Sequence, residues 1–183
     1  RGYARAITSD AFIAAVQAGP LGRIALTFVT WAEASRQVQV VPWTLIDCLA
    51  AARGFVAALF AAPYPTPGYT SISGAIDFSR RLLGDCRYPS TRRVIDVSGN
   101  GTNNSGRDVK DARDEAVAAG ITINGLPILG DQADIATYYA QNVIGGTGAF
   151  VTVVQNLATF ERATRRKLVT EIAAVSGDLQ RPS

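Results

Sequence analysis

The feature of this sequence that most constrains its fold is the alternation of short apolar runs with longer segments whose apolar residues recur at helical spacing. Residues 23–31, RIALTFVTW, are apolar on both faces, which is typical of a strand that helices cover on both sides, and residues 121–129, ITINGLPIL, are also predicted to be a strand. Helical spacing instead marks residues 71–83 and 157–174. The alternation predicts an α/β fold, an open, doubly wound and mostly parallel sheet with helices on both faces.

The remaining segments extend the same pattern. We expect further helices at residues 10–18, 47–61, 108–119 and 131–142, and further strands at residues 36–43, 92–97 and 149–155. Residues 36–43 alternate Gln with Val and include Pro42, which cannot donate to a strand ladder, so this strand is predicted at a sheet edge. A turn is expected at residues 63–68, and the length of 183 residues favours one domain over residues 1–183.

Composition excludes several classes of function. The chain has no histidine, which rules out a Ser-His-Asp or Cys-His hydrolase and a histidine-ligated zinc site within it. Its net charge of +3 comes from basic residues scattered in ones and twos, which argues against nucleic acid as a partner. No apolar run approaches the ~20 residues of a membrane span.

Asp96 is the acid that most invites a functional interpretation. The predicted strand 92–97 places it at a carboxyl end, where open α/β sheets bind ligands, and residues 97–106 that follow are rich in Ser, Gly and Asn. Three interpretations compete for this loop. A phosphate loop would need a third glycine closer to Gly101 or a Gly-Lys-Ser/Thr run, a structural turn would use Asp96 to accept local hydrogen bonds, and a metal site would use its carboxylate as a ligand.

A second loop, around Thr70, pairs with the first. Thr70 lies just before a predicted helix and could act only as its N-cap. However, the order of strand, Gly-x-Thr, helix, strand and Asp-x-Ser-Gly resembles the von Willebrand factor A domain, and the resemblance covers nearly the whole chain. In that family the Thr and the Asp are parts of a metal-ion-dependent adhesion site.

More narrowly, the sequence resembles an uncharacterised family of exported bacterial proteins that are similar to von Willebrand factor A. The phrases that carry this resemblance are RGYARAI, VVPWTLID, RRVIDVSGNGTNN, AAGITINGLPI, YYAQNVIGGTGAF and RRKLVTEIA. The resemblance implies a Rossmann-like fold with one antiparallel edge strand and a periplasmic or secreted location.

The resemblance also implies a strand that this sequence does not contain. The family's first strand is central and ends in Asp-x-Ser-x-Ser, whose side chains are the main metal ligands, but no such motif occurs here. The chain has no methionine and begins at Arg1. We therefore expect the domain to be incomplete at its N-terminus, with the strand supplied by an upstream segment or by another chain.

The site implied by the resemblance would bind a hard cation. Hydroxyl, carboxylate and water ligands suit Mg²⁺ or Mn²⁺, with Ca²⁺ as a further candidate. Thr70 would coordinate through its hydroxyl and Asp96 through water, and a carboxylate from a protein partner would complete the shell. With only these ligands, metal affinity should be weak or absent. Ser71, Ser98, Asn100 and Asn103 are expected on the rim, where they orient water, touch the partner or simply form turns.

The two cysteines fit the same topology. If the edge strand is antiparallel to the others, the helix that begins near Cys48 and the helix that ends near Cys86 reach the same face. A Cys48–Cys86 disulfide is then expected, in agreement with an oxidising compartment, and two buried thiols are the alternative.

The expected function is therefore a non-catalytic, metal-dependent adhesion or protein-binding module. One alternative is a degenerate scaffold that has lost its metal. The other is an enzyme or a nucleotide-binding protein that uses the loop after Asp96, but this loop offers a single acid and no nearby lysine.

Overall fold

The computed structural model describes residues 2–63, 68–130, 132, 134–155 and 157–178. Parts of the predicted turn at 63–68 and of the predicted helix 131–142 lie outside these residues. The chain forms two compact units. The first comprises Arg1–Phe28, Val40–Pro63 and Leu157–Ser183, and the second comprises Val29–Gln39 and Tyr64–Asn156.

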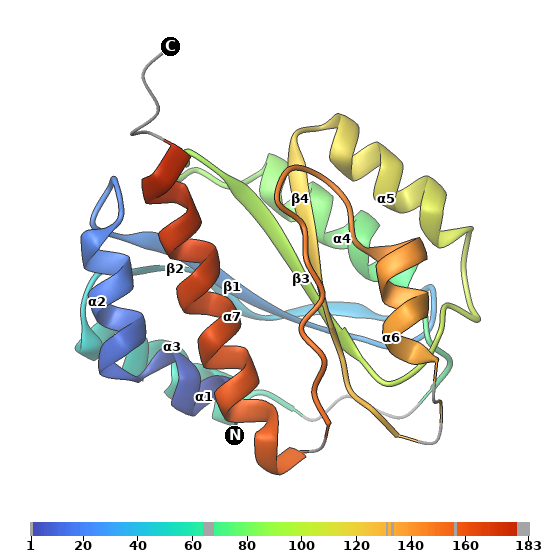
Figure 1. The fold of residues 1–183 in the computed structure, drawn as a ribbon, viewed down its shortest axis with the longest axis horizontal. Coiled ribbons are helices and arrows are strands. Elements are labelled where there is room, and N and C mark those ends of the chain that lie inside the picture. The colour runs from blue at the N-terminus through green and yellow to red at the C-terminus, as the bar shows by residue number, and fades with distance from the viewer. Residues whose placement is uncertain (1, 64–67, 131, 133, 156, 179–183) are drawn as a thin grey trace. The chain divides into compact units, whose positions relative to one another are not determined.

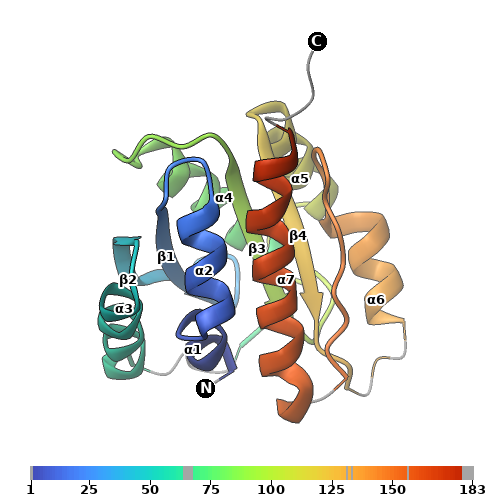
Figure 2. The same cartoon turned by 60° about the vertical axis from the view of Figure 1, so that its left-hand side comes forward.

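Within the described residues, the first unit contains four helices. They are α1 (Gly2–Ile7), α2 (Asp10–Ala18), α3 (Leu49–Ala61) and α7 (Leu157–Asp178). The hydroxyl of Ser9 caps α2 by accepting from the Phe12 N–H, which separates α1 from α2. Figure 2 shows α7 running beside α1 and α2, which it contacts. Phe12, Ile46, Phe55 and Leu168 belong to the buried core of this unit.

A β-hairpin contributes to both units. Its strands are β1 (Ile24–Trp31) and β2 (Gln37–Ile46), and the five residues between them allow only an antiparallel pairing. Among the described strands, β2 pairs with β1 alone, so the predicted edge strand is confirmed.

Two parallel strands form the centre of the second unit. In β3 (Arg93–Gly99) and β4 (Ile121–Pro127), Ile95 is the register partner of Ile123 and Gly99 that of Pro127. The predicted parallel α/β arrangement is confirmed here, but the described strands form two separate pairs and not one continuous sheet.

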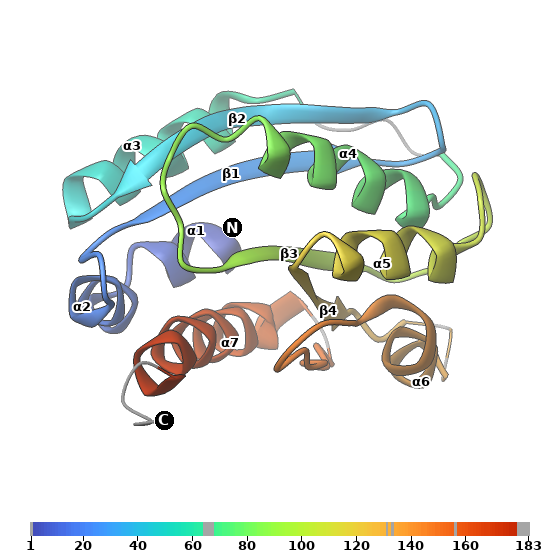
Figure 3. The same cartoon turned by 90° about the horizontal axis from the view of Figure 1, so that it is seen from above.

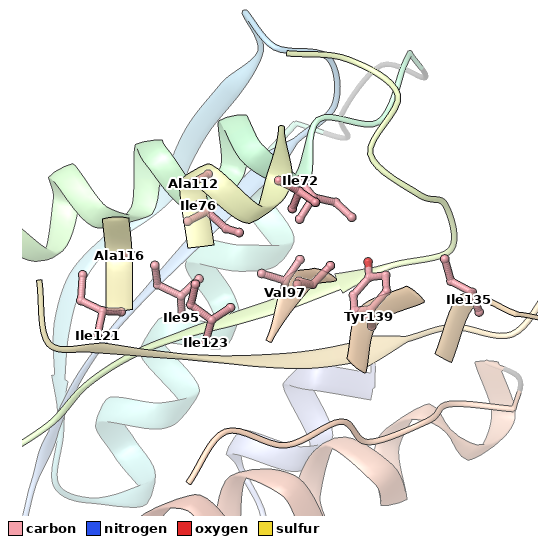
Figure 4. Close-up of a cluster of buried hydrophobic side chains, with 12 residues drawn as sticks. Ile72, Ile76, Ile95, Val97, Ala112, Ala116, Ile121, Ile123, Ile135 and Tyr139 are labelled. Atoms are coloured by element: carbon pink, nitrogen blue, oxygen red, sulfur yellow. The ribbon is translucent and has the colours of Figure 1, made fainter. Parts of the chain in front are cut away.

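The helices α4 (Ile72–Gly84) and α5 (Val109–Ala118) contact each other and cover one face of this pair, as Figures 1 and 3 show. Figure 4 shows how the core between these layers is made. The side chains that meet there are Ile95, Val97, Ile121 and Ile123 from the strands, Ile72 and Ile76 from α4, and Ala112 and Ala116 from α5. Tyr139 closes the cluster near the carboxyl end of β3.

The segment after β4 departs from expectation. The short helix α6 (Ile135–Tyr138) continues into one π-helical turn, η1 (Tyr139–Val143). Residues 149–155 run parallel to β4 and bond to it through the backbones of Phe150, Thr152 and Val154, but the pairing consists of isolated bridges and not of the continuous strand that was predicted. Pro127 has no N–H to donate to this segment, which interrupts the ladder between the bridges at Gly125 and Ile128. Gly146, at the start of the segment, has φ +91°, and a Cβ there would lie 2.8 Å from the Ile121 carbonyl oxygen.

Candidate functional site

The backbone of Thr70 is held by the start of α4. The next residue, Ser71, is the N-cap, and its hydroxyl accepts from the Gly74 N–H at 3.1 Å. The Ser71 N–H donates to the Ala32 carbonyl at 2.7 Å. Ser71 is fully buried and uses its side chain for the helix, which leaves Thr70, half-buried, outside the cap.

The loop after β3 docks onto Thr70 through Asn104. The Thr70 N–H donates to Asn104 Oδ1 at 2.7 Å, and the Asn104 N–H donates to the Thr70 carbonyl at 2.8 Å. Ser105 adds a second N–H to the same carbonyl at 3.2 Å. These bonds satisfy both backbone groups of Thr70 and hold the two loops side by side.

Asn103 lies deeper in the same junction. Its Oδ1 accepts from the Ser73 N–H at 3.0 Å, and its Nδ2 donates to the Arg107 carbonyl at 3.0 Å. Its own N–H donates to the hydroxyl of Tyr138 at 3.1 Å. The side chain of Asn103 is therefore a structural bridge between α4 and the loop.

The hydroxyl of Thr70 faces the first residues of this loop. A Cβ at Gly101 would lie 3.1 Å from Thr70 Oγ1, so the loop passes close to the hydroxyl. A Cβ at Gly99 would lie 2.8 Å from the Tyr139 hydroxyl and 3.2 Å from the ring of Trp31. Tyr139 is fully buried, burial raises the pKa of its phenol, and its hydroxyl has no hydrogen-bond partner within the described chain.

Asp96 does not lie at the end of its strand. β3 continues to Gly99, three residues further, which at about 3.3 Å per residue puts Asp96 about 10 Å from the carboxyl end. Its register partner is Asn124, whose Nδ2 donates to Asp96 Oδ1 at 3.5 Å. The predicted strand end was wrong because Ser98 and Gly99, which suggest a turn, stay in the ladder opposite Leu126 and Pro127.

The structure thus sorts the predicted rim residues. Ser98 is within β3, and its hydroxyl donates to the Leu126 carbonyl at 3.3 Å. Ser71 and Asn103 hold the loops together, whereas Asn100 is exposed at the first position after β3. Thr70 and Gly101 therefore lie close together just past the carboxyl end of β3, with Asn100 next to Gly101 in the chain, and this is the edge that ligands occupy in open α/β sheets.

Arg107 fixes the far end of the loop, and sequence reasoning missed it. Its guanidinium donates to both carboxylate oxygens of Asp77 on α4, at 2.9 and 2.7 Å, and to Glu115 on α5. The hydrogen bonds that Arg107 donates to Glu115 and Asp77 raise the pKa of Arg107, and the bonds that Glu115 accepts from Arg107 lower the pKa of Glu115. An arginine just before a helix N-terminus was the only available signal, because its two acids are 30 and 8 positions away.

The oxygen atoms at the carboxyl end of β3 that could bind a metal ion would make only part of a site for a hard cation. The described residues contain no group of three or more His, Cys, Asp or Glu side chains that could hold a metal ion. Thr70 and Asn100 offer neutral oxygens, whereas divalent cations of the Mg²⁺ type are usually bound with at least one carboxylate. One carboxylate lies near the Gly-x-Thr loop: Glu33 Oε2 would be 3.8 Å from a Cβ at Gly68, and Glu33 Oε1 pairs with Arg36 at 3.3 Å.

Cys48 and Cys86 are both free thiols, so the predicted disulfide is not formed. Cys48 is exposed ahead of α3 in the first unit, while Cys86 is partly buried after α4 in the second, and neither unit contains a second sulfur. Among the described residues, no helix is both long and apolar enough to cross a membrane.

A Gly-x-Thr loop docked against the loop that follows the neighbouring parallel strand, with helices over the sheet, defines a von Willebrand factor A-like α/β domain. The chain belongs to the family described as "Protein of unknown function (DUF1194)", whose model matches residues 1–176. A comparison with curated proteins gave no match.

Solved structures of the same type share the fold at low identity. Proximal thread matrix protein 1 from the mussel byssus is 12% identical with a TM-score of 0.63, over 94% of this chain and 43% of that one. A von Willebrand factor type A protein from Catenulispora acidiphila is 15% identical with a TM-score of 0.60, over 93% and 38%. An aerotolerance-related membrane protein from Bacteroides fragilis is 16% identical with a TM-score of 0.57, over 94% and 87%.

This chain therefore spans less than half the length of the mussel protein that it resembles. A further structure of that mussel protein, 15% identical with a TM-score of 0.55 over 79% of this chain and 35% of that one, has a zinc-occupied MIDAS motif. MIDAS denotes the metal-ion-dependent adhesion site that the Thr70 loop resembles.

Proposed function

We propose that this protein is a non-catalytic, metal-dependent protein-binding module whose binding face surrounds Thr70 at the carboxyl end of β3. The observation that carries the proposal is the docking of the Thr70 loop onto the loop after β3 through Asn104, which leaves the Thr70 hydroxyl facing Gly101. This junction is prebuilt, because backbone and side-chain hydrogen bonds fix Thr70 on both sides.

Thr70 is the proposed metal ligand within this chain, and Mg²⁺ or Mn²⁺ is the proposed ion, with Ca²⁺ as a further candidate. The zinc-occupied MIDAS motif of the mussel protein supports metal binding at this type of site. The resemblance assigns Asp96 a role through water, but its position inside β3 and its bond to Asn124 favour a structural role.

The proposed partner is a protein that presents an Asp or Glu carboxylate, which would complete the coordination shell of the ion. We propose a periplasmic or secreted location, for which the fold shared with the Bacteroides membrane protein and with the mussel byssus protein is supporting evidence. Nucleic acid is not a proposed partner, since the basic side chains are scattered.

A second candidate function is a binding scaffold without a metal. The lack of a carboxylate cluster among the described residues favours it. Such a scaffold would use the same exposed loop edge, so the two candidates differ only in whether the ion is required.

Calorimetric titration of the protein with MgCl₂ and MnCl₂ tests the choice. We expect weak binding that Thr70→Val abolishes, because valine keeps the shape of threonine and removes the oxygen ligand. Asp96→Asn is the matched control, and it should bind the ion as the parent protein does. Equal binding by the parent protein and Thr70→Val would overturn Thr70 as a ligand, and no binding by the parent protein would favour the scaffold.

A further inference from the structure

We propose that Asn100 is a site of spontaneous deamidation, and that its conversion to Asp places a carboxylate beside the Thr70 hydroxyl at the end of β3. The proposal combines the reactivity of an Asn-Gly sequence with the position at which the structure presents it. Its chemical part is independent of the function proposed above, and its functional part rests on that function.

The chemistry needs water and nothing else. The backbone nitrogen of Gly101, after loss of its proton, attacks Cγ of Asn100, a C–N bond forms, the bond to Nδ2 breaks, and ammonia leaves. Water then opens the resulting succinimide at one of its two carbonyl groups, which yields Asp or isoaspartate. Glycine favours the first step because no Cβ hinders the approach and because its backbone is the least restricted.

The structure does not block the attack of the Gly101 nitrogen on the Asn100 side chain. Asn100 is exposed and lies just past the last residue of β3, in a bend outside the ladder. Within the described chain, the Gly101 N–H donates no backbone hydrogen bond, and the Asn100 side chain makes none. The Gly101 nitrogen and the Asn100 side-chain amide therefore have no hydrogen bond within the described residues that would hold them apart.

The same dipeptide occurs a second time, in a setting that blocks the reaction. Asn124 is fully buried in β4, and its Oδ1 accepts from the Phe150 N–H at 3.1 Å. The Gly125 N–H donates to the Phe150 carbonyl at 3.1 Å. Asn124-Gly125 is thus an internal control with the same dipeptide and a backbone held by strand pairing.

The position of Asn100 near Thr70 means that its conversion to Asp should affect metal binding. The neighbouring Gly101 is the residue whose Cβ would lie 3.1 Å from Thr70 Oγ1, and the oxygen donors of Thr70 and Asn100 are neutral. An Asp at position 100 adds a charged ligand next to these neutral oxygens, and charge count is one of the terms that set the affinity of oxygen sites for divalent cations. Isoaspartate would instead lengthen the backbone and displace Gly101 from Thr70.

The chemical part is tested by incubating the full chain near neutral pH and at a more alkaline pH, followed by peptide mapping with mass spectrometry. We expect Asp and isoaspartate to accumulate at position 100, faster at the higher pH, while position 124 stays intact. Asn100→Gln should suppress the signal, since glutamine would have to close a larger ring. Equal rates at the two positions, or no product at position 100, would overturn the proposal.

The functional part is tested by calorimetry with MnCl₂ on freshly purified Asn100→Asp and Asn100→Gln proteins. We expect Asn100→Asp to bind at least about tenfold more tightly, as the added ligand charge requires. If Asn100→Gln binds as tightly as Asn100→Asp, the carboxylate is irrelevant and this inference fails while the proposed function survives. If neither variant nor the parent protein binds, metal-dependent adhesion and the gain in affinity fail together.

Discussion

Two adjacent tyrosines show how differently neighbouring residues are used at the candidate site. The hydroxyl of Tyr138 accepts from the Asn103 N–H at 3.1 Å and so anchors the loop after β3. The hydroxyl of Tyr139 is fully buried beside Gly99 and has no hydrogen-bond partner within the described residues. Burial without a partner usually destabilises a fold, so the two hydroxyls should contribute with opposite sign.

Phenylalanine substitution measures both contributions. Tyr138→Phe should lower the free energy of unfolding by about 1 kcal/mol, because a backbone donor loses its acceptor. Tyr139→Phe should be neutral or stabilising by up to about 1 kcal/mol, because it removes a buried hydroxyl that gains no bond. Urea denaturation followed by circular dichroism provides the comparison. A larger loss for Tyr139→Phe than for Tyr138→Phe would show that its hydroxyl has a partner in solution.

At the scale of single residues, the sequence predicted Thr70 and Asp96 as site residues, which stays a prediction, but not the contacts that position Thr70. Asn104 lies 34 positions away from Thr70 and Asn103 lies 30 away from Ser73, and no local pattern links such distant residues. Asp96 was placed at a strand end because turn-forming residues follow it. Pairing with β4 kept those residues in the strand, which is a long-range effect.

At the scale of elements, Arg107 joins α4 and α5 at the point where the loop ends. Asp77 and Glu115 both accept from its guanidinium, and Arg80 lies 3.3 Å from the same Glu115 carboxylate. These side chains are partly exposed, so the network is open to salt and solvent. The network mainly holds elements in position, because it connects the loop after β3 to α4 and to α5.

The network should make stability depend on pH. The Arg107 hydrogen bond lowers the pKa of Glu115 in the folded state below its ordinary value. The stability that Glu115 contributes is therefore fully present above the ordinary carboxyl pKa and is lost as the pH falls through the lowered folded value. Glu115→Gln should flatten the decrease in thermal midpoint between about pH 5 and pH 3. Asp111→Asn, on the same helix but outside the network, should leave the decrease unchanged, and identical curves for parent and Glu115→Gln would contradict the assignment.

Element types were easier to predict than their ends. The predicted helices at 71–83 and 108–119 correspond to α4 and α5 within a residue or two, because strong periodicity and clear caps define them. Residues 149–155 are mostly apolar, as a strand would be, and they do bond to β4 in parallel, but Pro127 has no N–H and the pairing is broken into isolated bridges. The residue types in 149–155 alone do not show how the segment pairs with β4.

At the scale of the whole molecule, the chain divides into two units, each with a hydrophobic core of its own. Phe55 belongs to one core and Ile123 to the other, and both are almost completely buried. The single domain expected from length remains a prediction. The α/β class was predictable because it depends only on the alternation of element types, whereas the division into units depends on which segments distant in sequence pack together.

Conservative truncations distinguish two independent cores from one cooperative fold. Ile123→Val should cost about 0.5–1.5 kcal/mol, and we expect its loss of amide hydrogen-exchange protection to concentrate in β3, β4 and the helices that cover them. Phe55→Leu should act mainly on α2, α3 and α7, because its core is confined to the first unit. Equal loss of protection in both units for either variant would mean that the chain unfolds as one body.

Deamidation at the exposed Asn100-Gly101 pair, compared with the buried Asn124-Gly125 pair, would also show how long a molecule has existed since its synthesis. Deamidation requires no enzyme and does not reverse on its own, so the charge at the end of β3 would increase with time after synthesis and not in response to a signal. A freshly made molecule and an old one would then present different faces to the same partner. Two preparations of identical sequence would differ in binding for no reason other than their storage.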